Sequence, residues 1–133
     1  MTPETAQAFL DANFAPWVLA LHPEVTRIDR DLTVLSMAMT DNLNRTGGIL
    51  SGQALTALAD TAMVLACCGH LGELIPVATV TLDTQFLRPA TGTGIRAEAE
   101  ITRAGRSMIF ARCTLLAEPA QKPVALATAT FAR

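Results

Sequence analysis

One carboxylate interrupts the most apolar stretch of the chain. Asp60 lies between Ala59 and Thr61. Because a buried carboxylate without a partner is costly, we expect Asp60 to have a partner, to face a cleft or to be protonated. At about 100° per helical residue, Gln53 and Thr56 lie within about 60° of Asp60 and form one polar stripe with it. The stripe predicts a narrow slot that is open at the N-terminal end of the helix. Spacing alone leaves open a structural role, in which Asp60 bonds Thr56 or pairs with an Arg across a dimer contact.

The segment before this stripe is rich in glycine. Gly47, Gly48 and Gly52 precede or open the expected helix, with Ser51 as its N-cap. The first N–H groups of a helix are unpaired and carry the positive end of its dipole, so the Gly52 N–H is a candidate to polarise a carbonyl group. For Gly47 and Gly48, turn formation is the preferred interpretation.

No other residues form a recognisable catalytic or metal-binding pattern. His22 and His70 are expected at the surface, and the three cysteines, Cys67, Cys68 and Cys113, on apolar elements. These thiols are expected to pack rather than react. No triad and no metal-ligand spacing is present, so we expect no metal and no cofactor.

The composition restricts the possible classes of protein. The chain has 133 residues, of which 50% are hydrophobic and 17% charged, with a net charge of −2. These values predict one folded domain over residues 1–133 and argue against a nucleic-acid binder. The apolar run 54–68 is shorter than the roughly 20 residues of a membrane span, which predicts no membrane contact. Without a signal-like start or a disulfide framework, a cytoplasmic protein is expected.

The patterns predict helices and strands in separate runs. A helix is expected over 3–13 with Thr2 as N-cap, followed by a bent lead-in to residue 22 that contains Pro16. The long helix is expected to start after Ser51 and to stop at Gly69, and Gly105 is expected to form a tight hairpin through a positive φ. Strands are expected over 24–30, 32–40, 76–88, 94–103, 107–117 and 124–132.

This order predicts an α+β fold. Strands that follow one another without intervening helices form antiparallel sheets. The long helix is apolar nearly all round, so it must be wrapped by other elements. We therefore expect a long central helix wrapped by a curved six-stranded antiparallel sheet.

Three segments carry a resemblance to a known family. GGILSGQALTALADTA, TVTLDTQFLRPA and the terminal ALATATF, in this order and spacing, resemble the hotdog-fold acyl-CoA thioesterases of the phenylacetate-degradation (PaaI-type) group. The resemblance covers about residues 42–131 and implies the hotdog fold. It also implies a homodimer, with stacking into a homotetramer left open.

The resemblance implies roles for individual residues. Asp60 matches the helix carboxylate that acts as base or nucleophile, and Gly52 the residue whose N–H polarises the thioester carbonyl. Thr79 matches a Ser or Thr that reaches the site from the second subunit and steadies the attacking water. The other implied substrate-binding residues are Asn44, Gly48, Ser51, Gln53, Arg88 and Arg106.

Two positions depart from the family pattern. The usual helix-start His and the second Gly are replaced by Ser51 and Gln53. Neither replacement supplies a proton as imidazole does, which leaves open how the leaving thiolate is assisted.

The implied function is hydrolysis of an acyl-CoA-type thioester at a dimer-interface site. The alternative is a hotdog protein that binds an acyl thioester or another apolar ligand without turnover. A hydratase is disfavoured because Leu65 stands where that branch has a His, five residues after Asp60. The acyl group and its carrier, coenzyme A or acyl carrier protein, stay open, and Phe86, Met63, Leu87 and Phe110 are candidates to line an apolar pocket.

Overall fold

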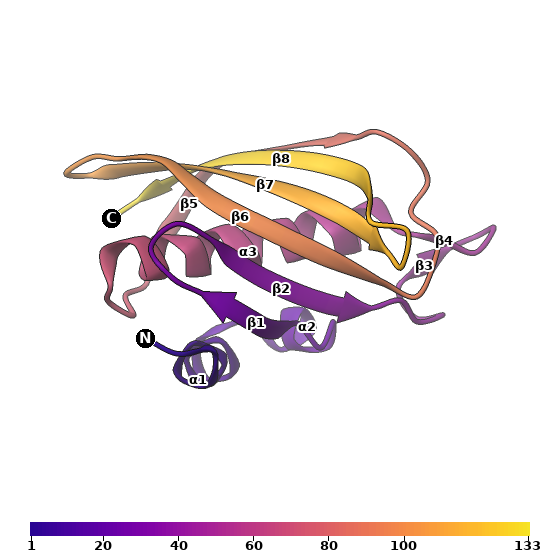
Figure 1. The fold of residues 1–133 in the computed structure, drawn as a ribbon, viewed down its shortest axis with the longest axis horizontal. Helices are drawn as coiled ribbons and strands as arrows, with labels where there is room; N and C mark the ends of the chain where they lie inside the picture. The colour runs from indigo at the N-terminus through magenta and orange to yellow at the C-terminus, as the bar shows by residue number, and fades with distance from the viewer.

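The fold consists of one sheet and one long helix, with two short helices at its edge. The computed structural model describes residues 1–133, all of the chain. In chain order the elements are α1 (Pro3–Asn13), α2 (Pro16–Leu19), β1 (Glu24–Ile28), β2 (Thr33–Ala38), β3 (Asn44–Arg45), β4 (Ile49–Leu50), α3 (Gly52–Leu71), β5 (Ala78–Phe86), β6 (Gly94–Ala104), β7 (Met108–Glu118) and β8 (Lys122–Ala132) (Figure 1).

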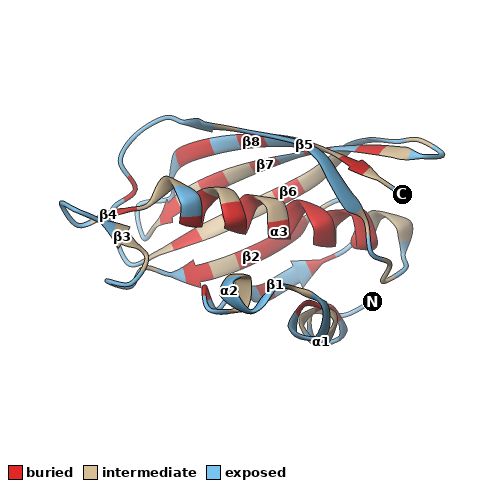
Figure 2. Cartoon of the chain, turned by 180° about the vertical axis from the view of Figure 1, so that it is seen from behind, coloured by how far each residue is buried: buried red, intermediate tan, exposed pale blue.

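Six strands form a single antiparallel sheet in the order β1-β2-β6-β7-β8-β5. α3 crosses one face of this sheet, and seen from that side it lies in front of the strands, with β6 and β2 visible on either side of it (Figure 2). The predicted α+β fold, with a long helix against a six-stranded antiparallel sheet, is confirmed.

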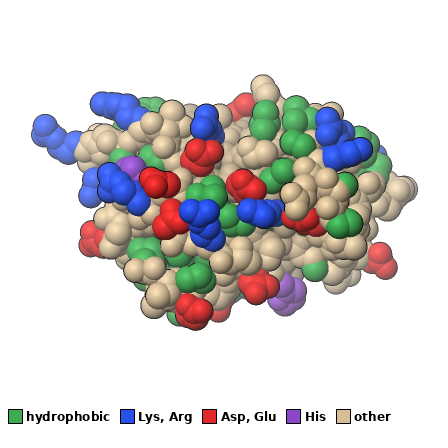
Figure 3. Space-filling view, in the orientation of Figure 1, with side chains coloured by type: hydrophobic (Ala, Val, Ile, Leu, Met, Phe, Trp, Pro, Cys, Tyr) green, Lys and Arg blue, Asp and Glu red, His purple; other side chains and the backbone are tan.

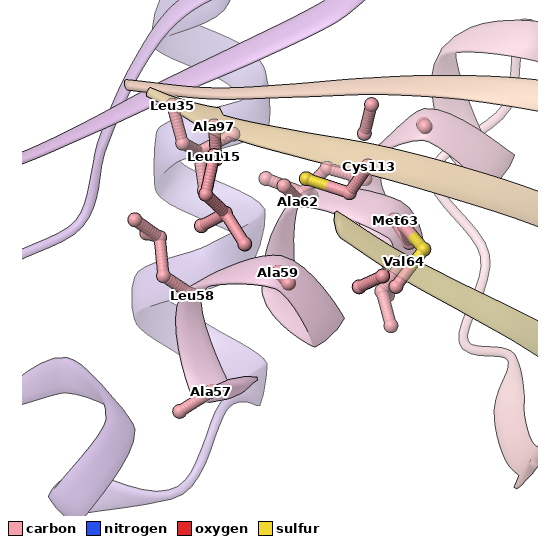
Figure 4. Packing of buried hydrophobic residues seen from close by; sticks show 14 of the residues in the cluster. Leu35, Ala57, Leu58, Ala59, Ala62, Met63, Val64, Ala97, Cys113 and Leu115 are labelled. Atoms are coloured by element: carbon pink, nitrogen blue, oxygen red, sulfur yellow. The ribbon is translucent and has the colours of Figure 1, made fainter. Parts of the chain in front are cut away.

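The core lies between α3 and the sheet. Alternate residues of β6, β7 and β8 are buried, as expected for strands with one covered face. Leu58, Ala59 and Ala62 of α3 lie near Leu35 and Leu115 of the sheet (Figure 4). Small alanines on both sides let the helix approach the sheet closely.

α3 is longer than predicted, and a different glycine ends it. The helix runs 20 residues to Leu71, and Gly72 caps it with a left-handed φ of 72°. Gly69 instead allows close packing, because a Cβ there would lie 2.6 Å from the Asp29 carbonyl oxygen. The prediction that Gly69 stops the helix is wrong, since the small residue serves packing rather than capping.

The length argument against a membrane span is also wrong. The 20 residues of α3, with a mean hydropathy of 1.5, are long and apolar enough to cross a bilayer. However, 72% of the most apolar window is buried inside the fold. Such burial is typical of a core helix wrapped by its own domain.

The two expected turns differ from their predicted forms. Residues 44–50 form a small hairpin of β3 and β4, with Gly47 (φ 98°) and Gly48 (φ 72°) in its turn. This confirms turn formation for both glycines. Gly105 does not have a positive φ, so that prediction is wrong; its N–H closes the β6–β7 turn by donating to the Met108 carbonyl at 2.8 Å.

The outer face of the sheet carries charges of both signs. Ion pairs join Arg96 to Glu98 at 3.0 Å and Arg112 to Glu100 at 3.2 Å. On the side shown in Figure 3, basic and acidic side chains are interspersed. This side therefore presents no broad basic surface.

Candidate active site

An open groove lies between α3, β5 and the indole of Trp17 in α2. It encloses about 570 Å³. The predicted polar stripe forms one wall. From α3 the groove is lined by Gly52, Gln53, Thr56, Ala57 and Asp60, and from β5 by Leu82 and Phe86.

Asp60 is half-buried in this groove and has one side-chain partner. The Thr79 hydroxyl donates a hydrogen bond to Asp60 Oδ1 at 3.0 Å. Burial raises the pKa of Asp60 above its ordinary value, and the hydrogen bond from Thr79 opposes part of that rise. No Arg is paired with Asp60; the three ion pairs of the chain lie elsewhere. The carboxylate is therefore desolvated but held ready to accept a proton.

Thr79 lies within hydrogen-bonding distance of Asp60 in its own chain. This contact forms because the chain turns at Gly72 and β5 returns along α3, which brings its first residues beside the middle of the helix. The resemblance implied that this hydroxyl reaches the site of the second subunit, and that role stays a prediction.

The start of α3 presents free N–H groups. Ser51 caps the helix, and its side chain accepts a hydrogen bond from Ala54 N at 3.3 Å. The N–H groups of Gly52 and Gln53 donate no hydrogen bond within the chain. They can hold an oxygen that carries negative charge. Gly52 lies against the Phe86 ring, where a Cβ would approach Cζ at 3.1 Å.

Helix and strand run antiparallel along the groove. Asp60 meets Thr79 at one end, Thr56 bonds Thr84 at 3.2 Å in the middle, and Gly52 meets Phe86 at the other end. Gly52 and Asp60 are eight residues apart, which is about 12 Å along the helix axis. The free N–H groups and the carboxylate therefore occupy opposite ends of the groove.

A second groove of about 410 Å³ begins where the first ends. The two share Gly52 and Phe86, and the second is also lined by Arg45 and Arg88. Neither guanidinium takes part in an ion pair of the chain. The second groove is thus positively charged, whereas the first carries the Asp60 carboxylate.

Several predicted residues lie outside both grooves. Asn44 is in β3, with its Oδ1 buried and unpartnered, and Gly48 is in the turn after it. Arg106 lies in the β6–β7 turn, at the opposite end of the molecule from the start of α3 (Figure 1). The structure does not bring these three residues to the Asp60 groove of their own chain.

The four residues that were candidates to line an apolar pocket lie in different parts of the structure. Phe86 lines both grooves and Leu87 the second one. Met63 is fully buried in the core, and Phe110 lies on the outer face of β7 between the buried Ile109 and Ala111. Phe86 is the only one of the four that lines the groove of Asp60.

Trp17 and Arg45 are among the groove residues that were missed from sequence. Trp17 belongs to the short helix that the sequence showed only as a bent lead-in, and Arg45 to a two-residue strand hidden in a turn-rich segment. Neither segment has a periodic pattern that would assign its side chains a direction. The only available signal was that Trp17 is the single Trp of the chain.

The remaining reactive side chains do not join the site. Burial raises the pKa of both Cys67 and Cys113 to about 12 and also raises that of Cys68. These thiols stay protonated and pack in the core. No group of three or more His, Cys, Asp or Glu side chains lies close enough to hold a metal ion.

Similarities to known proteins agree with this architecture. "Putative esterase Ta0293" of Thermoplasma acidophilum is 30% identical over 88 residues, which span 65% of this chain and 65% of that protein. A thioesterase from Haemophilus influenzae superimposes with a TM-score of 0.87 at 22% identity, covering 99% of this chain and 90% of the other. The Escherichia coli PaaI protein superimposes with a TM-score of 0.80 at 23% identity, covering 98% and 95%. The fold is accordingly the hotdog fold.

The sequence also matches the model of a known protein family. Residues 47–124 match the Thioesterase superfamily, and this range contains the start of α3, Asp60, Thr79 and Arg88. The range covers more than half of the chain, so the chain belongs to the thioesterase superfamily.

Proposed function

We propose that this protein hydrolyses an acyl-CoA-type thioester, with Asp60 as the base or nucleophile. The observation that supports this most directly is the Asp60–Thr79 pair, set in an open groove that ends at free helix N–H groups. Thioester hydrolysis needs these two functions: a group that delivers the oxygen nucleophile and a donor that stabilises the oxyanion.

The chemistry follows from the two ends of the groove. The Gly52 N–H donates to the thioester carbonyl oxygen, which becomes the oxyanion of the tetrahedral intermediate. In one route Asp60 takes a proton from a water molecule while the water oxygen bonds the carbonyl carbon. In the other route an Asp60 oxygen attacks that carbon directly, and water then hydrolyses the resulting anhydride and regenerates Asp60. Collapse breaks the carbon–sulfur bond and releases a thiolate, a far better leaving group than an amide nitrogen. The Thr79 hydroxyl fixes one Asp60 oxygen and leaves the other for the reaction.

One chain alone cannot bring these two groups to one carbonyl. The oxyanion donor and the base must both lie within about 3–3.5 Å of the reacting atoms. Gly52 and Asp60 are separated by about 12 Å on the same helix, and helix N–H groups point toward the N-terminus, away from Asp60. A second copy must therefore supply one of the two groups.

The exposed edge of β5 is the contact that would supply it. β5 is the last strand of the sheet and is exposed at every residue except Thr84 (Figure 2). Val80 and Phe86 are each 54% exposed, and an edge strand of nine residues with exposed apolar side chains favours pairing with another strand.

Antiparallel pairing of two β5 strands gives the required geometry. Full overlap of Ala78–Phe86 with its copy is centred on Leu82, so Thr79 lies opposite Gln85 and Ala78 opposite Phe86 of the other copy. The end that holds Asp60 then faces the end that holds Gly52 in the other copy. The proposed site combines Asp60 and Thr79 of one chain with the Gly52 N–H of its partner.

The two unpaired arginines support a phosphate-bearing carrier. Arg45 and Arg88 line a groove that meets the helix start at Gly52, within reach of a substrate whose carbonyl is held there. Guanidinium groups bind phosphates bidentately, and coenzyme A carries several phosphates.

A turnover assay tests this proposal. We expect free thiol to be released from at least one member of a panel of acyl-CoA thioesters, and the Asp60→Asn variant to be about 10²-fold slower or more. Single turnover in ¹⁸O-water tests for direct attack, because a mixed anhydride that water cleaves at the Asp60 carboxyl carbon places the first ¹⁸O in Asp60 rather than in the product acid. Tight binding of acyl-CoA without thiol release would instead favour the ligand-binding alternative.

A further inference from the structure

Three exposed apolar side chains converge on the groove that holds Asp60. Trp17 is 62% exposed, Phe86 54% and Leu82 37%. They come from two elements that are far apart in sequence, α2 and β5. The indole of Trp17 therefore closes the side of the groove away from the β5 strand.

The backbone segment that carries the indole is anchored. Pro16 opens α2, and the chain continues as turns in which Leu19 N donates to Ala15 O at 3.1 Å and Leu21 N to Val18 O at 3.0 Å. The flanking Leu10 and Leu21 are buried in the core. Trp17 thus stands on an anchored segment and not on a free end of the chain.

The charges of the two grooves decide which part of a thioester lies against Trp17. The first groove contains the Asp60 carboxylate and no cationic side chain, whereas the second contains Arg45 and Arg88. A phosphate-bearing carrier is repelled by the first groove and attracted by the second. Only the uncharged acyl group suits the first groove, where most of the surface is carbon.

We propose that Trp17 is a specificity-determining residue whose indole forms the far wall of the acyl-binding groove. This proposal rests on the proposed thioesterase function. The acyl group extends from the carbonyl beside Asp60 and lies between Phe86 and Trp17, so its length is limited by the indole. Covering these side chains removes apolar surface from water and contributes to binding. The residue acts on substrate choice and takes no part in the chemical step.

The first experiment measures the preference for acyl length. We expect kcat/KM over straight-chain acyl-CoAs from acetyl to dodecanoyl to peak at a shorter chain in wild type than in Trp17→Ala. The ratio of long-chain to short-chain kcat/KM should rise about tenfold, mainly through KM, which is the discrimination that one or two methylene groups give in an apolar site. Trp17→Phe, which keeps a ring, should give an intermediate ratio.

A matched control removes a comparable apolar side chain elsewhere. Leu126 is 41% exposed on the outer face of β8, between the buried Ala125 and Ala127, and faces away from the groove. Leu126→Ala should keep the wild-type ratio. If folded Trp17→Ala keeps the wild-type ratio as well, the proposal is overturned.

The second experiment reports on the acyl group without turnover. Trp17 is the only Trp of the chain, so its emission is a direct probe of the groove. In the Asp60→Asn background, we expect octanoyl-CoA to change this emission at saturation and free coenzyme A, with the same phosphates, to change it far less. Equal changes with both compounds, or no change with either, would overturn the assignment.

These outcomes separate the two proposals. If no thioester is hydrolysed but octanoyl-CoA alone changes Trp17 emission, the thioesterase function fails and the acyl-binding role of Trp17 is supported. If thioesters are hydrolysed but the ratio of long-chain to short-chain kcat/KM is the same in wild type and Trp17→Ala, the thioesterase function is supported and the role of Trp17 is refuted.

Discussion

Two inactive variants of this protein should restore each other's activity. Asp60→Asn removes the proposed base, and Gly52→Pro removes the N–H that is proposed to bind the oxyanion. Proline is tolerated at the first position of a helix, and Ser51 already has the extended φ and ψ (−64°, 145°) that a residue before proline requires. If Asp60 and Gly52 of opposite chains form each site, a heterodimer of the two variants contains one intact site and one doubly damaged site.

The expected recovery follows from counting sites. Each variant alone should keep about 1% of wild-type turnover, because a positioned base and an oxyanion donor each contribute about 10²-fold. Random exchange in a 1:1 mixture makes half of the dimers heterodimers, and each of these has one good site of two. The mixture should therefore reach about 25% of wild-type activity, and a purified heterodimer about 50%.

The assay measures thiol release before and after the two variants are mixed, unfolded together and refolded, with differently tagged chains to quantify exchange. Gly52→Ala is the matched control, since it adds the same Cβ against Phe86 but keeps the N–H. A mixture of Asp60→Asn with Thr79→Val should not recover, because those two residues form one pair within one chain. Recovery in this second mixture would mean that Thr79 crosses to the other subunit. No recovery in the first, despite proven exchange, would refute the shared site.

Three further results are expected. Asp60→Asn should melt no lower than wild type at neutral pH: the folded pKa of Asp60 is raised, so the stability that protonation adds is present below its ordinary pKa and lost as pH rises through the raised value. This difference in melting temperature should shrink below about pH 4, and a marked loss of stability in Asp60→Asn would point to a structural carboxylate. Thr79→Val should move the acid limb of the kcat/KM profile to higher pH, because it removes a hydrogen bond that lowers the pKa of Asp60. Thr79→Ser keeps the hydroxyl and should leave the limb in place. An unmoved limb in both variants would show that the bond does not form in solution. Leu82→Cys at the centre of the proposed pair of β5 strands should form a disulfide-linked dimer on mild oxidation, because opposed antiparallel residues have Cα atoms about 4.5–5.5 Å apart. The control variant Leu126→Cys should stay monomeric on a non-reducing gel. Equal cross-linking of both variants would argue against β5 pairing.

Periodicity predicted the fold because the main elements are long and regular. α1 begins and ends where predicted, and Thr2 and Pro3 mark its start. Two reciprocal hydrogen bonds cap this start, one from Thr2 N to the Thr5 side chain and one from Thr5 N to the Thr2 side chain. The short β3–β4 hairpin was missed because two residues carry no alternation. Gly69 was mistaken for a helix stop because a glycine that allows close packing and one that caps look alike in sequence.

The polar α3 wall of the groove was predictable from sequence, and the Trp17 side of the groove was not. The stripe of Gln53, Thr56 and Asp60 follows from helical spacing, and all three residues line the groove. Trp17 lines the same groove only because the tertiary fold brings α2 to it, which no local pattern encodes. Resemblance placed Thr79 near Asp60, and the structure shows this contact within one chain. The assignment of Thr79 to the second subunit stays a prediction, because a motif records which residues meet and not the chain from which each one comes.

The proposed dimer gives a common explanation for three features that look unfavourable in one chain. The edge strand β5 exposes three large apolar side chains, the groove beside it is open, and the two ends needed for the proposed reaction are about 12 Å apart. An isolated monomer would bear the cost of exposing Val80, Leu82 and Phe86 and gain no activity from the Asp60–Thr79 pair. Pairing of two β5 strands would bury the edge, close the groove and join each carboxylate to the other chain's helix start in a single step. Dilution below the dimer dissociation constant should therefore abolish thiol release in proportion to the loss of dimer, and a monomer that retains full turnover would contradict the reasoning.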